Sequence, residues 1–182
     1  MYEYPLLWEW LGFAVRWLHV ITAIAWIGSS FYFIALDLGL LPSTDRREGV
    51  SGEAWQVHGG GFYFIQKYMV SPSRMPDTLT WFIWESYSTW LSGAALLILV
   101  YYVGADMYLV DLAKADLSIW AAIAISAASL TIGWLVYDRL CESGLAERPT
   151  LLMILLFVLL MAMGYGYNQI FTGRAVLLHL GA

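Results

Sequence analysis

The sequence predicts an all-α integral membrane protein with four transmembrane helices, the start of a fifth, and a short β-like segment on the cytoplasmic side. Hydrophobic residues make up 60% of the 182 and charged residues only 13%, whereas soluble proteins average about half and about a quarter. The 10 tryptophans and 12 tyrosines are typical of chains whose rings lie at membrane–water interfaces. A soluble domain of this length would expose a large apolar patch, so lipid is the simplest solvent for this chain.

Charge and cysteine usage exclude several other classes of protein. The net charge is −5 and the nine basic residues are scattered, which argues against a nucleic-acid partner. Cys141 is the single cysteine, so the chain has neither a disulfide framework nor a CxxCH haem-attachment motif. The N-terminal stretch is acidic and lacks the basic region of a signal peptide. We therefore expect the first apolar segment to remain in the mature protein as a helix.

Four stretches reach the length of about 20 apolar residues that a spanning helix needs. They cover about residues 13–41, 80–103, 117–136 and 150–171. Ser118 and Thr150 are candidate N-caps, and Pro149 precedes the first turn of the fourth helix. The segment 173–182 is about half as long as a span. We expect it to be the start of a fifth helix in a longer protein of which this chain is a part.

Residues 55–77 match neither a helix nor an ordinary loop. His58 is followed by Gly59, Gly60 and Gly61, and then by a β-branched and aromatic run that ends at two proline-containing turns. This pattern predicts a short strand or hairpin. Irregular backbone near the membrane is tolerated where protein or water covers it, so we expect this segment to form part of a cavity wall on the cytoplasmic side.

The distribution of basic residues predicts the orientation of the chain. Six lie on the side of the first and third inter-helix loops, whereas three lie on the other side. The six are Arg46, Arg47, Lys67, Arg74, Arg139 and Arg148, and the three are Arg16, Lys114 and Arg174. Because basic residues favour the cytoplasmic side, we expect the N-terminus to lie outside.

Two histidines lie about one turn inside apolar segments, His19 in the first helix and His179 in the last segment. A neutral imidazole at such a position suits ligation of haem iron, a haem b. It equally suits a hydrogen bond to a neighbouring helix, because lipid offers no partner. The orientation above places both histidines on the outer side, where they could hold one haem together or serve separate haems.

Two further residues are candidates for acid–base chemistry. His58 precedes the three glycines, which permit positive φ and a close approach of backbone to a ligand; a flexible turn is the alternative. Glu85 lies early in the second helix among aromatic residues, where a carboxylate faces a cavity or a partner, or else reaches to the headgroups. Lys67 could supply positive charge to an anionic substrate or to anionic lipid.

Three motifs carry a resemblance to a known family. They are RWLHVITAIAWIGSSFYFIALDLGL from Arg16, EAWQVHGGGFYFIQKY from Glu53 and GRAVLLHLGA from Gly173. With them the whole chain, in order, closely resembles the bacterial membrane-bound urate hydroxylase family. The resemblance implies a multi-pass membrane domain of the bacterial inner membrane, followed outside by a cytochrome c domain. This chain corresponds to roughly the first half of that membrane domain and lacks the remaining helices.

The resemblance implies oxidation of urate to 5-hydroxyisourate, with electrons passing to cytochrome c, either as a domain or as a soluble protein. Urate is a planar anion, so Trp84, with Trp81 and Phe62, would wall a flat slot, and Lys67 would supply charge. The backbone N–H groups of Gly60 and Gly61 would approach the purine oxygens. His58 or Glu85 would take a proton. His19 and His179 would hold haem b iron. The chain could also form a homo-oligomer.

A more distant resemblance gives two alternatives. The spacing of His19, Trp26 and Gly28 is similar to a helix of HemJ-type protoporphyrinogen oxidases and CopD-like copper proteins, which are small membrane bundles with a histidine at a helix end. The other alternative is a non-catalytic haem- or quinone-linked subunit that transfers electrons with a partner.

Overall fold

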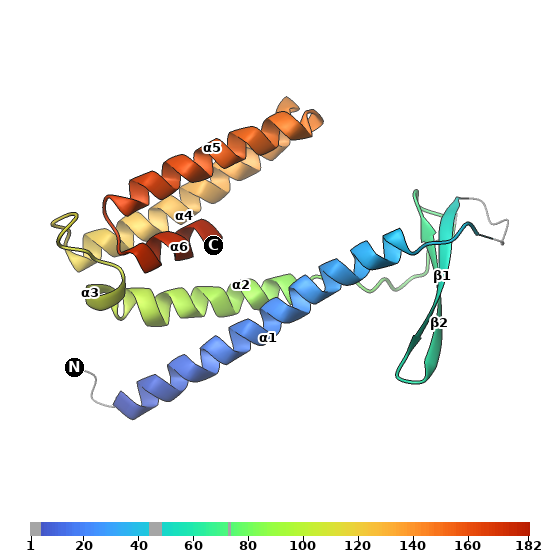
Figure 1. Ribbon diagram of the computed structural model, residues 1–182, viewed down its shortest axis with the longest axis horizontal. Helices are drawn as coiled ribbons and strands as arrows, with labels where there is room; N and C mark the ends of the chain where they lie inside the picture. Colours follow the sequence, from blue (N-terminus) through green and yellow to red (C-terminus); the bar gives the residue numbers. More distant parts are fainter. Residues whose placement is uncertain (1–4, 44–48, 73) are drawn as a thin grey trace. The chain divides into compact units, whose positions relative to one another are not determined.

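The computed structural model describes residues 5–43, 49–72 and 74–182, and it is mostly helical with one β-hairpin (Figure 1). The chain divides into two compact units, which are described separately. One unit is Trp17–Leu91, and the other combines Met1–Arg16 with Ser92–Ala182. Arg46 and Arg47, on which the expected orientation partly rests, lie outside the described residues.

Three of the described helices are long and apolar enough to cross a membrane. They are α1 (Pro5–Leu38), α4 (Ile119–Glu142) and α5 (Pro149–Asn168). Little of their apolar surface is buried inside the protein, as expected of helices that face lipid. Helix α1 begins well before residue 13, with a proline at its first position, where the fixed φ of that residue suits a helix start.

The β-like segment expected from the glycines is a two-stranded antiparallel hairpin of β1 (Val50–His58) and β2 (Gly61–Tyr68). The two residues of its turn, Gly59 and Gly60, have φ of 57° and 81°. Two consecutive positive φ values define the tight turn whose twist matches paired strands. The register shifts between Val50 and Gly52. A Cβ on Gly52 would approach Leu40 Cβ to 3.0 Å, so a glycine lets the hairpin lie against the chain that leaves α1.

The helix expected over residues 80–103 has two parts. Helix α2 (Trp84–Leu96) continues directly as a π-helix, η1 (Leu97–Tyr102). The short α3 (Ala105–Tyr108) follows. Hydrophobic periodicity does not distinguish a π turn from an α turn over six residues, so the sequence did not predict η1.

Helix α4 begins at the expected cap, because the Ser118 side chain accepts a hydrogen bond from Ala121 N at 3.2 Å. The Thr150 cap is wrong: α5 starts at Pro149, which supplies a preset φ at the first position instead of a capping side chain. The 3₁₀ turn η2 (Gly144–Glu147) joins α4 to α5. Helix α6 (Gly173–Gly181) follows α5 and is capped by Thr172.

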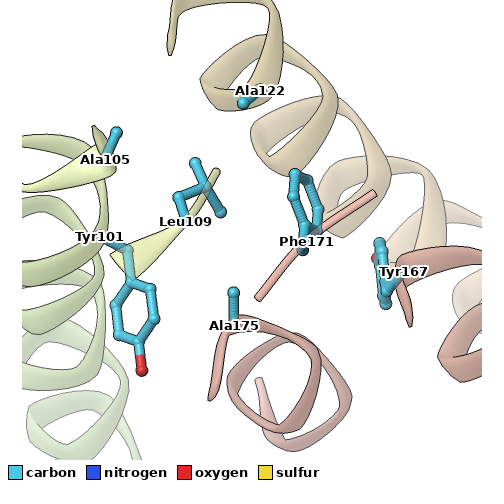
Figure 2. Close-up of a cluster of buried hydrophobic side chains, with 7 residues drawn as sticks. All are labelled: Tyr101, Ala105, Leu109, Ala122, Tyr167, Phe171 and Ala175. Atoms are coloured by element: carbon cyan, nitrogen blue, oxygen red, sulfur yellow. The ribbon is translucent and has the colours of Figure 1, made fainter. Parts of the chain in front are cut away.

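The core of the unit that contains α4, α5 and α6 is small. Figure 2 shows its buried side chains, which come from helices and from the connections that hold Leu109 and Phe171: Tyr101, Ala105, Leu109, Ala122, Tyr167, Phe171 and Ala175. The backbone around Phe171 is tied to the α3 region, because Val110 pairs with Phe171 and Thr172 N donates to Leu109 O at 3.1 Å. Lys114 Nζ also donates to Phe171 O at 2.9 Å. This joint fixes where α6 begins.

Thr172→Val should lower the free energy of unfolding by about 1–2 kcal/mol, because it removes the α6 cap. The hydroxyl accepts from Ala175 N at 3.3 Å and donates to Tyr108 O at 2.5 Å. Thr131→Val is the matched control, since its exposed hydroxyl donates to Ala127 O of its own helix. Unfolding in mixed micelles followed by circular dichroism would measure both, and equal changes would contradict the role of Thr172.

Candidate functional site

The segments that carry the expected substrate residues contact the last two turns of α1. Lys67 Nζ in β2 forms an ion pair with Asp37 Oδ2 of α1 at 2.6 Å. Tyr32 OH, also in α1, donates a hydrogen bond to Gln56 Oε1 of β1 at 2.5 Å. One face of the hairpin is therefore fastened to the end of α1.

The segment that leads into α2 reaches the same end of α1. Phe33 of α1 and Phe82 make an edge-to-face ring contact with centroids 5.0 Å apart. Trp84 follows at the first position of α2 and is exposed, and Glu85 is half-buried in the first turn. Lys67, Trp84 and Glu85 thus belong to two segments that pack against one helix end.

His58, Gly60 and Gly61 lie at the tip of the hairpin, where His58 pairs with Gly61 and is exposed. The tight turn itself accounts for the positive φ of Gly60. Lys67 lies six residues after Gly61 on β2, which is about 20 Å along a strand. Urate is much shorter than that distance. The structure therefore does not bring His58 and Lys67 together on one substrate molecule.

His179 of α6 is 3% exposed, and both of its ring nitrogens are hydrogen-bonded. Nδ1 donates to Ala175 O at 2.6 Å, because a carbonyl only accepts. In the neutral ring Nε2 then accepts, so Ser126 Oγ, 2.6 Å away, donates to it. Tyr102 OH, 3.0 Å from Ser126 Oγ, is left to donate to Ser126. A directed chain of hydrogen bonds thus runs from η1 through α4 to α6.

This arrangement matches a haem ligand only in part. A hydrogen bond from Nδ1 to a backbone carbonyl is typical of histidines that bind metal through Nε2. However, Nε2 is already bonded to Ser126, and the rings of Tyr167 and Phe171 lie 5.0 and 5.1 Å from the imidazole centroid. A haem iron at Nε2 would have to displace the Ser126 hydroxyl. The geometry favours a histidine that joins helices, and haem ligation by His179 stays a prediction.

His19 lies half-buried in α1, in the unit of Trp17–Leu91, whereas His179 belongs to the other unit. The binding of one haem by both histidines therefore stays a prediction. In residues 5–43, 49–72 and 74–182, no three His, Cys, Asp or Glu side chains are grouped as ligands for a metal ion.

Sequence reasoning missed the partners of the predicted residues. Asp37 is the only charged residue of the first apolar stretch after Arg16, and that isolation is a signal that could have paired it with a cation. Ser126 and Tyr102 carried no such signal. The structure also has a shallow hollow of about 320 Å³ on α4, but no predicted site residue contributes to it. It is lined by Ile132, Leu135, Val136, Arg139 and Leu140.

Comparison with known proteins identifies the family. The model of one family, described as urate oxidase N-terminal, matches residues 5–182. No curated protein and no solved structure matches the chain. The family match covers both described units, including the hairpin, the start of α2 and the buried histidine of α6. The chain therefore belongs to the urate oxidase N-terminal family.

Proposed function

We propose that this chain is a portion of the membrane domain of a urate hydroxylase that oxidises urate to 5-hydroxyisourate. Urate and one water give 5-hydroxyisourate, two protons and two electrons, and ferric cytochrome c accepts the electrons one at a time. The observation that carries the proposal is the family match over residues 5–182. The alternatives of a HemJ-type or CopD-like protein, or of a non-catalytic subunit, have no comparable support.

The end of α1 is the proposed urate site. The Lys67 ammonium retains N–H donors beyond the one directed at Asp37, and these can bind the urate anion. The exposed ring of Trp84 offers a flat apolar face for the purine. Glu85 follows Trp84 in the sequence and is half-buried. Its carboxylate accepts a proton as the purine is oxidised. Asp37 orients the Lys67 side chain.

The proposal places the chain in the bacterial inner membrane with a periplasmic N-terminus and cytochrome c on the periplasmic side. Three helices of sufficient length and apolarity support a membrane location, and the bias of basic residues supports the orientation. Haem b on His19 belongs to the same proposal, since a haem exchanges single electrons with cytochrome c. No step of the proposal needs haem at His179.

The test is urate oxidation by the full-length natural protein, without oxygen and in ¹⁸O-labelled water, with ferric cytochrome c as acceptor. We expect urate-dependent cytochrome reduction and one labelled oxygen in the 5-hydroxyl group. Activity that requires dioxygen would contradict the proposed electron path. A protein that folds and binds cytochrome c, but never reduces it with urate, would favour the non-catalytic subunit.

A further inference from the structure

One face of the hairpin carries four large apolar side chains that the described residues leave exposed. Trp55, Val57, Phe62 and Phe64 are 71%, 65%, 77% and 44% exposed. They form two cross-strand pairs, Trp55 with Phe64 and Val57 with Phe62, and cross-strand partners point to the same side of a sheet. The rings of Trp55 and Phe64 lie 4.8 Å apart. We call these four residues the outer face.

The opposite face of the hairpin is the one fastened to α1. Side chains alternate between the two faces along a strand, so Gln56 and Lys67 point away from the outer face. These are the residues that bond Tyr32 and Asp37. The outer face is therefore directed away from α1.

The contacts with α1 set the level of the hairpin relative to the apolar span. Residues 17–36 contain no Asp, Glu, Lys or Arg, and these 20 residues rise about 30 Å as a helix, which equals the hydrocarbon thickness of a bilayer. Asp37 is the first charge after them, so its ion pair with Lys67 marks the end of the span. Tyr32 lies about 7 Å further in, and it holds Gln56 at that depth. If residues 17–36 cross the hydrocarbon, these contacts hold the hairpin at the boundary between headgroups and acyl chains.

We propose that the outer face inserts into the lipid interface and anchors the hairpin beside the end of α1; this inference rests on the membrane location proposed above. Trp and Phe are suited to that zone, and an apolar face there is buried only a few ångströms deep. The unpaired backbone groups along the hairpin edges keep it from going deeper, because hydrocarbon cannot satisfy them.

A hairpin with this face exposed to water would be only marginally stable. Two strands alone are marginally stable there, and a patch of four large apolar side chains marks a contact surface. A second copy of the chain could also cover such a patch. Lipid is favoured because the other face of the hairpin is bonded to α1, which is a candidate membrane span. Those bonds lie where the apolar stretch of α1 ends.

The experiment uses full-length protein in which Cys141 and any further free cysteine are replaced by serine, and in which one new cysteine carries an environment-sensitive fluorophore. Phe62→Cys reports on the outer face, and Tyr63→Cys is the matched control, because it is 52% exposed but on the opposite face. The proteins are reconstituted in phosphatidylethanolamine–phosphatidylglycerol vesicles with nitroxide-labelled lipid. We expect blue-shifted emission at position 62 and much stronger quenching there than at position 63.

Equal quenching at the two positions would overturn the proposal. So would a blue shift at position 62 that lipid nitroxide leaves unquenched and that fades as protein is diluted in lipid, since it would indicate a second copy. Val57→Cys gives a second outer-face position should Phe62→Cys fail to fold. Membrane extraction and urate-dependent cytochrome reduction of the same samples separate failure of the anchor from failure of the proposed function.

Discussion

Glu85→Gln in the full-length enzyme is expected to lower the rate of urate-driven cytochrome c reduction about 10²–10⁴-fold, the usual effect of removing a positioned base. Glutamine keeps the size of the side chain but cannot accept a proton near neutral pH. The half-buried position of Glu85 in the first turn of α2 makes a folding defect small by comparison. Steady-state reduction of cytochrome c, normalised to folded protein, measures the effect.

Two companion variants locate the base. Glu142→Gln is the control, because its carboxylate is exposed and pairs with Arg139 of the same helix. His58→Ala tests the hairpin tip, which lies about 20 Å along the strand from Lys67. A large loss in His58→Ala with normal turnover in Glu85→Gln would move the chemistry to the tip. Near-normal turnover in both would place the site outside this chain.

His179→Ala is expected to lower the free energy of unfolding by roughly 2–4 kcal/mol, because it removes two buried hydrogen bonds and leaves a gap beside the rings of Tyr167 and Phe171. Ser126 would also lose the acceptor of its hydroxyl. Leu177→Ala is the matched control, since Leu177 lies on the same helix and is 73% exposed. Unfolding by denaturant in detergent, followed by circular dichroism, compares the two variants.

The visible spectrum decides between the two roles of His179. If the histidine only joins helices, Ser126→Ala and His179→Ala destabilise the protein and neither changes a haem absorption band. If His179 is a haem ligand, His179→Ala removes or shifts the Soret band. Ser126→Ala, in contrast, frees Nε2 and leaves the Soret band in place. His19→Ala, measured in parallel, tests the other expected ligand. An unaltered spectrum in both histidine variants would contradict haem ligation.

The sequence was most informative where a short-range rule decides the outcome. The two turn glycines predicted a hairpin because only glycine adopts two consecutive positive φ values at low cost. Ser118 predicted its own helix start, because a capping hydroxyl acts within one turn. Thr150 failed because Pro149 competes for the same start with a preset φ.

The site was less predictable because its contacts join residues far apart in the chain. Lys67 was expected to bind an anion, but nothing local indicated that it pairs with Asp37, 30 residues earlier. The partner of His179 is Ser126, 53 residues away, and depends on which helices are neighbours. A histidine in an apolar segment shows the need for a hydrogen-bond partner, but it does not identify that partner.

The π-helix η1 gives the chain room for a change of one residue in length. A π turn contains one residue more than an α turn needs, and η1 ends at Tyr102, whose hydroxyl reaches Ser126. Deleting one residue from 97–101 would let the segment relax to an ordinary α-helix, and Tyr102 would keep its direction because the π turn had absorbed the extra residue. A second deletion would remove a residue that the α-helix needs, and it would turn Tyr102 away from Ser126 by about 100°. Family members that keep this contact should therefore tolerate a gap of one residue in the segment but not a gap of two.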